Sequence, residues 1–175
     1  MNKIKLKDNI SILYNEEKIS VSRNNHIKIL CNERCSAPSL NTKNNKFVYL
    51  SPLEWEEISK LKLYNIEEDI LNEIEINNIS DQDTIKQVQW ISDSKLIMIV
   101  GFANGTVTVG GDIFTYDIYS KEYNNIYKSL DGEEVKHFDI KDDTLEMEVI
   151  TFDEDFNGYT RRKENIKIRD KEVLL

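Results

Sequence analysis

Residues 153–164 are the segment whose residue types and spacing best match a metal-binding pattern. Their sequence, DEDFNGYTRRKE, fits the D-x-[DN]-x-[DN]-G-x5-E spacing of a calcium loop, in which hard oxygen ligands surround the ion and a glycine makes the sharp bend. The ligands of such a loop would come from Asp153, Asp155, Asn157, the Tyr159 carbonyl and Glu164. Calcium is therefore the one cofactor that the sequence suggests.

The surroundings of this loop favour a second interpretation. The preceding residues 144–152 alternate as a strand does, Thr160 stands where the loop normally has an apolar residue, and Arg161, Arg162 and Lys163 place three cations inside it. The alternative is an acidic β-hairpin with Asn157-Gly158 as a type I′ turn. Both interpretations remain open from the sequence.

A second candidate is the connection from Asn104 to Gly111, NGTVTVGG, which combines turn residues with β-branched residues. It indicates a small protruding hairpin or a glycine-rich bend between two strands. A phosphate loop is disfavoured because the Gly-x4-Gly-Lys-Ser/Thr pattern is absent. The predicted binding surface consists of Asn104, Gly105, Thr106, Gly110 and Gly111.

The sequence contains no strong pattern of catalytic residues. His137 could act as a general base beside Asp139 or Asp142, but a single histidine on a strand is more often structural, and no Gly-x-Ser-x-Gly nucleophile elbow occurs. We therefore predict no catalytic residues and no enzymatic activity. The aromatic residues fall mainly on strand positions, which favours core packing for Tyr49, Trp55, Tyr64, Trp90, Phe114, Tyr116 and Tyr123.

The amino-acid composition limits the classes of partner that the protein is expected to bind. The chain has 175 residues, enough for one domain with a moderate core, and a formal net charge of −9. Nucleic acid is an unexpected partner because binding it needs a basic face. Two cysteines and two histidines support neither a disulfide framework nor a closed zinc site.

The N-terminal residues lack the apolar run of a signal peptide or membrane span, so we expect a cytoplasmic protein with no membrane partner. Export or anchoring stays open for a truncated chain.

The strand patterns are organised in units. Residues 1–34 read as an N-terminal β-meander with three strands, at residues 10–14, 18–22 and 26–30. Related units follow at 35–78 and 84–130, and a degenerate third unit at 133–175. An Asn/Asp-containing turn before an apolar strand recurs at steps of 49 residues, and each unit offers four short strands in up-and-down order.

Two segments interrupt this scheme. Ser51-Pro52-Leu53-Glu54 is a capping box with proline at the first helical position, and it predicts a short helix of two or three turns through Trp55, Ile58 and Leu61. Residues 66–76 have an apolar spacing that also suits a helix, but their match to the second unit favours a strand.

The segments SAPSL…NNKFVYL and WISDSKL resemble the P-x-W-S-x-D-G-K strand-turn-strand of TolB-like β-propellers, and LYNI and TYDI resemble the third strand of that family. The whole is similar to small bacterial propeller-like domains of uncharacterised function. The resemblance implies an all-β, antiparallel array of blades, in which the meander supplies a fourth blade completed by C-terminal strands. The alternatives are an incomplete array, closure by pairing with a second chain, and a β-sandwich. It implies a binding or protein-interaction module, monomeric or homodimeric, whose partner is a protein or a small ligand.

Overall fold

The computed structural model describes residues 1–54, 57–104, 108–169 and 172–173, and every regular element in them is a β-strand. The first sheet contains β1 (Asn2–Lys5), β2 (Ile10–Asn15), β3 (Lys18–Arg23) and β4 (His26–Cys31). The second contains β5 (Ser39–Leu40), β6 (Lys46–Ser51), β7 (Lys60–Asn65) and β8 (Ile70–Ile74). The third contains β9 (Asp83–Trp90), β10 (Lys95–Phe102), β11 (Asp112–Asp117) and β12 (Tyr123–Tyr127). The fourth contains β13 (Glu133–Lys141), β14 (Thr144–Phe152), β15 (Tyr159–Arg169) and β16 (Glu172–Val173).

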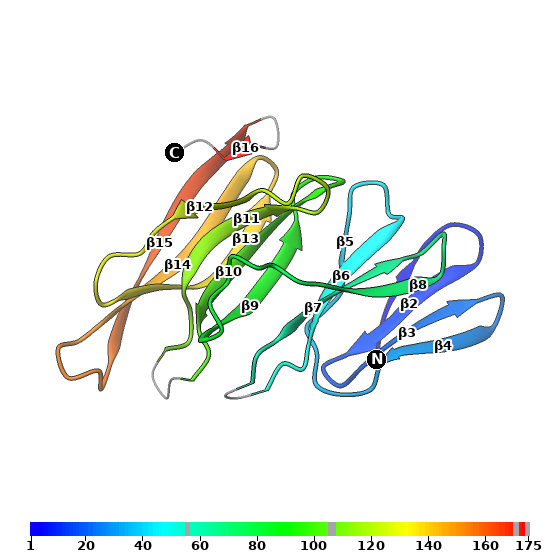
Figure 1. The fold of residues 1–175 in the computed structure, drawn as a ribbon, viewed down its shortest axis with the longest axis horizontal. Coiled ribbons are helices and arrows are strands. Elements are labelled where there is room, and N and C mark those ends of the chain that lie inside the picture. The colour runs from blue at the N-terminus through cyan, green and yellow to red at the C-terminus, as the bar shows by residue number, and fades with distance from the viewer. Residues whose placement is uncertain (55–56, 105–107, 170–171, 174–175) are drawn as a thin grey trace.

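The four sheets lie side by side in chain order, from the blue first sheet to the orange and red fourth sheet (Figure 1). Within each sheet, consecutive strands pair antiparallel in up-and-down order. This arrangement confirms the predicted all-β class and the propeller-like stacking of blades. The β-sandwich alternative is wrong, because the sheets follow one another in a row instead of facing each other as a single pair.

The N-terminal meander forms a complete sheet of its own. The three predicted strands are β2, β3 and β4, and β1 adds a fourth by pairing Asn2 with Tyr14 and Lys5 with Ser11. The prediction that the meander supplies a fourth blade is confirmed. The strand that completes it comes from the N-terminus and not from the C-terminus, since a short turn brings β1 directly against β2.

The helix predicted after Ser51 is absent from the described residues. Ser51 is the last residue of β6 and pairs with Lys60, the first residue of β7. Its hydroxyl donates to the Glu33 carboxylate and lies 3.3 Å from Cys31 Sγ, so it is not used as a helix cap. Trp55 lies outside the described residues. The strand preferred for residues 66–76 is confirmed as β8.

Apolar residues form three clusters, each between neighbouring sheets. The first and second sheets enclose a cluster around Ile12, Phe47 and Tyr64, in which the two rings lie 5.2 Å apart. The second and third sheets enclose Val48, Leu50, Leu61, Trp90, Met98 and Tyr116. The third and fourth enclose Ile97, Ile99, Val135, Phe138, Leu145 and Met147. Among the described residues these clusters do not join the first sheet to the fourth, so the array is open.

The second strand of each later sheet shows how the row ends. Its third and fifth residues are Val48 and Leu50 in β6, and Ile97 and Ile99 in β10, and all four are buried against the next sheet. The third and fifth residues of β14 are Glu146 and Glu148, which pair with Lys141 at 2.5 Å and with Arg161 at 3.5 Å. Charge thus replaces apolar surface where no further sheet follows, as in the capping units of repeat proteins.

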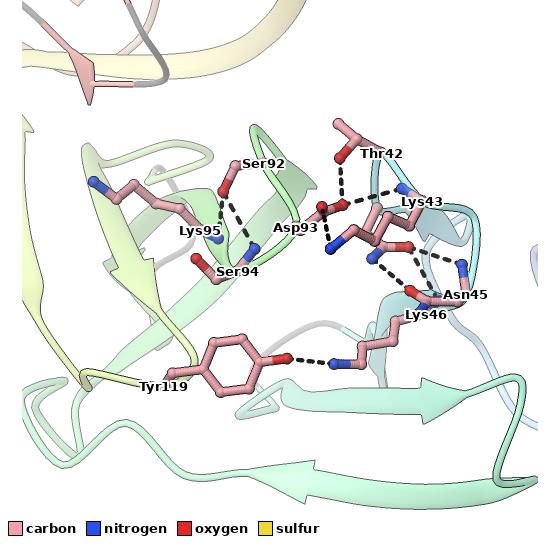
Figure 2. Close-up of polar contacts among 10 residues, drawn as sticks. Thr42, Lys43, Asn45, Lys46, Ser92, Asp93, Ser94, Lys95 and Tyr119 are labelled. Atoms are coloured by element: carbon pink, nitrogen blue, oxygen red, sulfur yellow. Dashed lines mark hydrogen bonds and ion pairs between the residues drawn. The ribbon is translucent and has the colours of Figure 1, made fainter.

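Figure 2 shows how the hairpin turns of the second and third sheets contact each other. Asp93 accepts hydrogen bonds from the Thr42 hydroxyl and, at 3.0 Å, from the Lys43 backbone N–H, and its second oxygen lies 3.0 Å from Lys43 Nζ. Nearby, Lys46 Nζ donates to the Tyr119 hydroxyl at 2.6 Å. The turn residues singled out in the sequence therefore also join one sheet to the next.

Replacing Asp93 with asparagine is expected to lower stability at neutral pH and to have less effect in acid. The hydrogen bonds from Thr42 and Lys43, and the Lys43 charge, hold the Asp93 pKa below its usual value of 3.8. A carboxyl group whose pKa is lowered by folding stabilises the protein above its unfolded pKa, and that contribution is lost as pH falls through the folded pKa. Chemical unfolding of both proteins at pH 7 and below pH 4 measures the difference.

Asp131→Asn is the matched control, because it removes an exposed carboxylate without a hydrogen-bond partner among the described side chains. A stability gap between wild type and Asp93→Asn that keeps its size from pH 7 to pH 3 would contradict the interpretation.

Candidate functional site

Three glycines allow close backbone contacts at one end of the third sheet, two of them within that sheet and one with the fourth sheet. A Cβ on Gly101 would lie 2.1 Å from the Gly110 carbonyl oxygen, one on Gly110 would lie 2.2 Å from the Val135 oxygen, and one on Gly111 would lie 2.1 Å from the Val100 oxygen. Real Cβ atoms do not approach this closely, so only glycine fits at these positions. Gly111 and Val135 also exchange two backbone hydrogen bonds, at 3.1 and 2.9 Å, between the third and fourth sheets.

Glu134 fixes the same connection from the fourth sheet. One of its carboxylate oxygens accepts the backbone N–H groups of Val109 at 3.0 Å and Gly110 at 2.7 Å. Lys86 on β9 donates to the Thr108 carbonyl at 3.1 Å, and its burial lowers the pKa of the ammonium group. The glycine-rich bend is therefore held by hydrogen bonds to Glu134 of the fourth sheet and to Lys86 of the third sheet.

A pocket of about 370 Å³ opens beside these glycines. The β8–β9 linker, β9, the end of β10, β11, β12 and the start of β13 all contribute to it. Its lining contains four carboxylates and no lysine or arginine. The side chains that carry its chemistry are Asp83, Asp112, Phe114, Tyr123, Glu133 and Glu134.

The aromatic wall of the pocket is the stacked pair of Phe114 and Tyr123, whose ring centroids lie 4.7 Å apart at an interplanar angle of 8°. Burial raises the pKa of the Tyr123 hydroxyl, and the negative charges of Asp83 and Asp112 raise it further. The Phe102 side chain, 41% exposed, stands at the rim. The pocket thus combines a flat aromatic surface with acidic side chains.

Three of the four carboxylates are occupied by protein groups. Glu133 forms a bidentate pair with Arg162, at 2.6 and 2.8 Å, and this pair lowers the pKa of Glu133. Asp112 accepts the backbone N–H of Ser129 at 2.9 Å, and Glu134 is held as described above. Asp83 accepts no hydrogen bond from the described residues, so its carboxylate is the one available to a ligand.

The predicted binding surface overlaps this pocket in part. Gly110 and Gly111 line it, whereas Asn104 is exposed outside the lining, and Gly105 and Thr106 lie outside the described residues. The acidic and aromatic lining was not singled out as a site in the sequence. The one available signal was the position of Phe114, three residues after the double glycine.

The residues predicted to bind calcium are not brought together. Asp153 and Asn157 belong to the hairpin turn between β14 and β15, where the Asn157 N–H donates to Asp153 Oδ1 at 2.8 Å. Glu164 lies five residues beyond Tyr159 on β15, roughly 17 Å along an extended strand, and pairs with Arg162 at 2.7 Å. Among the described residues, no group of three or more His, Cys, Asp or Glu side chains is placed to hold a metal. The hairpin alternative describes the segment better, although the positive φ of 55° falls on Phe156 and not on the predicted turn pair.

His137 lies on the surface and pairs with Asp139, at 3.4 Å, with both side chains more than half exposed. Cys31 and Cys35 are buried and carry free thiols, and burial raises the pKa of Cys35 to about 12. A thiol with such a pKa is a poor nucleophile at neutral pH.

The fold and the pocket define the class of protein, which is an open, propeller-like array of four β-sheets. A protein from Clostridium novyi NT described as a conserved lipoprotein matches with a TM-score of 0.69 and 18% identity, over 77% of this chain and 88% of that one. The β-propeller domain of the trilobed protease from Pyrococcus furiosus matches with a TM-score of 0.53 and 16% identity, over 94% and 51% of the two chains. TolB from Acinetobacter baumannii matches with a TM-score of 0.51 and 10% identity, over 94% and 40%. The chain spans about half or less of these two propeller proteins, and the likeness shows the fold alone.

Residues 51–169 match the family described as Domain of unknown function (DUF4652), and the chain belongs to it. The comparison with curated proteins finds no match. The predicted resemblance to TolB-like propellers is confirmed by the structural matches. None of the described residues forms a helix of the length and apolar character that crossing a membrane requires.

Proposed function

We propose that the protein is a non-enzymatic binding module, and that the pocket at the end of the third sheet holds a positively charged group of a small ligand or a protein partner. The observation that carries this proposal is the lining of the pocket, which joins four carboxylates to a stacked aromatic pair without a lysine or arginine.

Electrostatics favour a cation there. The whole chain carries a net charge of −9, and a concave site lined by one sign of charge concentrates the field at its mouth. Asp83 supplies an acceptor without a protein donor, at the edge of β9 where the strand enters the sheet. An ammonium or guanidinium group would gain a charge-assisted hydrogen bond to that carboxylate.

The aromatic wall favours the same chemistry. A cation over the face of a tyrosine or phenylalanine ring gains about 0.5–2 kcal/mol, depending on how far it is removed from water. Phe114 and Tyr123 are half-buried and fixed by stacking, so little side-chain freedom would be lost when a ligand binds.

Asp83→Asn is expected to weaken binding of a small cation about tenfold, a loss of roughly 1.4 kcal/mol, because the amide keeps the shape of the side chain and removes its charge. Arginine and choline are suitable probes, and their dissociation constants are measured from amide chemical shifts in titrations at constant ionic strength. The shifts should centre on Gly110, Gly111 and Phe114.

Asp81→Asn is the control, since it removes a carboxylate two residues away that does not line this pocket. Equal weakening by both substitutions would show that only overall charge matters. Saturable shifts at a different surface would refute the assignment of the pocket.

The cytoplasmic location remains a prediction from the sequence. The Clostridium novyi protein of similar fold is described as a lipoprotein. The alternative to a cytoplasmic location is therefore a membrane-anchored location outside the cytoplasm.

A further inference from the structure

The first sheet lies at the opposite end of the row from the fourth sheet (Figure 1). Its outward face carries a pocket of about 590 Å³. Three of its side chains form one row across three strands, because Lys5 pairs with Ser11 and Ser11 pairs with Ser22. Directly opposed residues in an antiparallel sheet share a face and have Cβ atoms about 5 Å apart. The alternate residues Ile12 and Val21 point the other way, into the cluster shared with the second sheet.

The polar groups around this row are hydrogen-bond donors without protein partners. The Lys3 and Lys5 ammonium groups form no ion pair with the described residues, and the Ser11 and Ser22 hydroxyls form no hydrogen bond with them. The lining contains no aspartate or glutamate. A pocket that offers two cations and two hydroxyls, with no carboxylate in its lining, suits an anion.

Two hairpin turns complete the pocket at the same end of the sheet. Asn24 and Asn25 form the β3–β4 turn with φ values of 48° and 67°, and Asn9 in the β1–β2 turn has a φ of 56°. Residues with positive φ in tight turns direct backbone N–H groups outward, where they contribute to anion binding. Their side-chain amides add further donors.

The uneven distribution of charge along the chain favours anion binding at the first sheet. Residues 1–34 contain seven Lys and Arg against four Asp and Glu, a net charge of +3, whereas the other 141 residues contain sixteen against twenty-eight, a net charge of −12. The first sheet is therefore the basic part of an acidic protein, and an anion approaching from solution is attracted to it and repelled elsewhere.

We propose that this pocket binds a phosphate-type oxyanion, with Lys3 and Lys5 neutralising its charge and Ser11 and Ser22 donating to its oxygens. The site is separate from the acidic pocket of the third sheet and does not depend on the function proposed for it. A tetrahedral oxyanion presents several acceptors at once, which matches the convergence of ammonium, hydroxyl and amide donors from three strands and two turns.

The test is a titration of the full chain with inorganic phosphate, followed by amide chemical shifts at constant ionic strength maintained with chloride. Saturable shifts are expected at Ser11, Ser22, Asn24 and Asn25. The double substitution Lys3→Ser, Lys5→Ser is expected to raise the dissociation constant at least tenfold. Lys163→Ser, Lys167→Ser is the matched control, because it removes two exposed lysines from a strand of the opposite terminal sheet, and it should leave the constant unchanged.

Shifts that follow ionic strength and do not depend on phosphate would overturn the proposal, as would an equal loss in both double variants. A second experiment with lipid vesicles distinguishes a soluble phosphate ligand from the phosphate of a lipid headgroup. Cosedimentation with phosphatidylglycerol vesicles but no saturable response to inorganic phosphate would replace a soluble oxyanion by a lipid surface and would refute the site as stated.

Discussion

Gly111→Ala is expected to destabilise the protein by at least about 3 kcal/mol and to abolish ligand binding at the pocket of the third sheet. The new methyl carbon would lie 2.1 Å from the Val100 carbonyl oxygen and 2.7 Å from the Gly101 Cα, and both are backbone atoms that cannot turn aside. Relief requires β11 to move away from β10, which would break the paired hydrogen bonds between Gly111 and Val135. Urea unfolding followed by circular dichroism measures the loss.

Gly132→Ala separates steric overlap from the general cost of losing a glycine. Gly132 has a φ of 78°, and a Cβ there would meet no atom within 4 Å. Its replacement should cost only the strain of a left-handed residue, about 1–2 kcal/mol. If Gly111→Ala proved no more destabilising than Gly132→Ala, the close approach of the Gly111 backbone to β10 would not be a requirement of the fold.

The double substitution Glu146→Ile, Glu148→Ile is expected to make the protein self-associate through the outward face of its fourth sheet. The variant would give β14 the outward pattern of β10, where Ile97 and Ile99 are fully buried against the next sheet. No sheet of the described chain covers that face. Burying one isoleucine side chain is worth about 1.5–3 kcal/mol, so two should strengthen self-association at least about 100-fold.

Light scattering coupled to size exclusion measures the mass of the variant over a range of protein concentrations. Glu67→Ile, Glu68→Ile is the matched control, because it makes the same change of charge in the exposed β7–β8 turn, away from any sheet face. A mass equal to that of wild type at all concentrations would argue against charge as the feature that ends the row.

The strands were predictable because their signal is local. Alternation of apolar residues, and asparagine or aspartate before an apolar run, located β6, β10 and β14, which begin at Lys46, Lys95 and Thr144. A different local signal, the capping box that begins at Ser51, gave a wrong prediction. A capping box shows only that a helix end is chemically possible, and the pairing of Ser51 with Lys60 and the contact of its hydroxyl with Glu33 decide otherwise.

The candidate site was predictable only in part. The combination of turn residues with β-branched residues drew attention to residues 104–111, and Gly110 and Gly111 do line the pocket. Asp83 and Glu134 could not be joined to them from the sequence. Asp83 reaches the glycines through the pairing of β9 and β10 within the third sheet, and Glu134 reaches them only when the fourth sheet packs beside the third. The spacing of residues 153–164 misled for the opposite reason, since an extended strand carries Glu164 away from the turn.

The sequence by itself determined the all-β class, the up-and-down order of short strands and the acidic character of the chain, because periodicity, turn residues and charge are properties of short segments or of the whole composition. Only the tertiary structure decided that β1 completes the first sheet, that Glu146 and Glu148 end the row, and that the glycine-rich bend serves the contact between two sheets. The physical reason is that burial and steric contact depend on which sheet lies beside which, and that is set by packing over the whole chain.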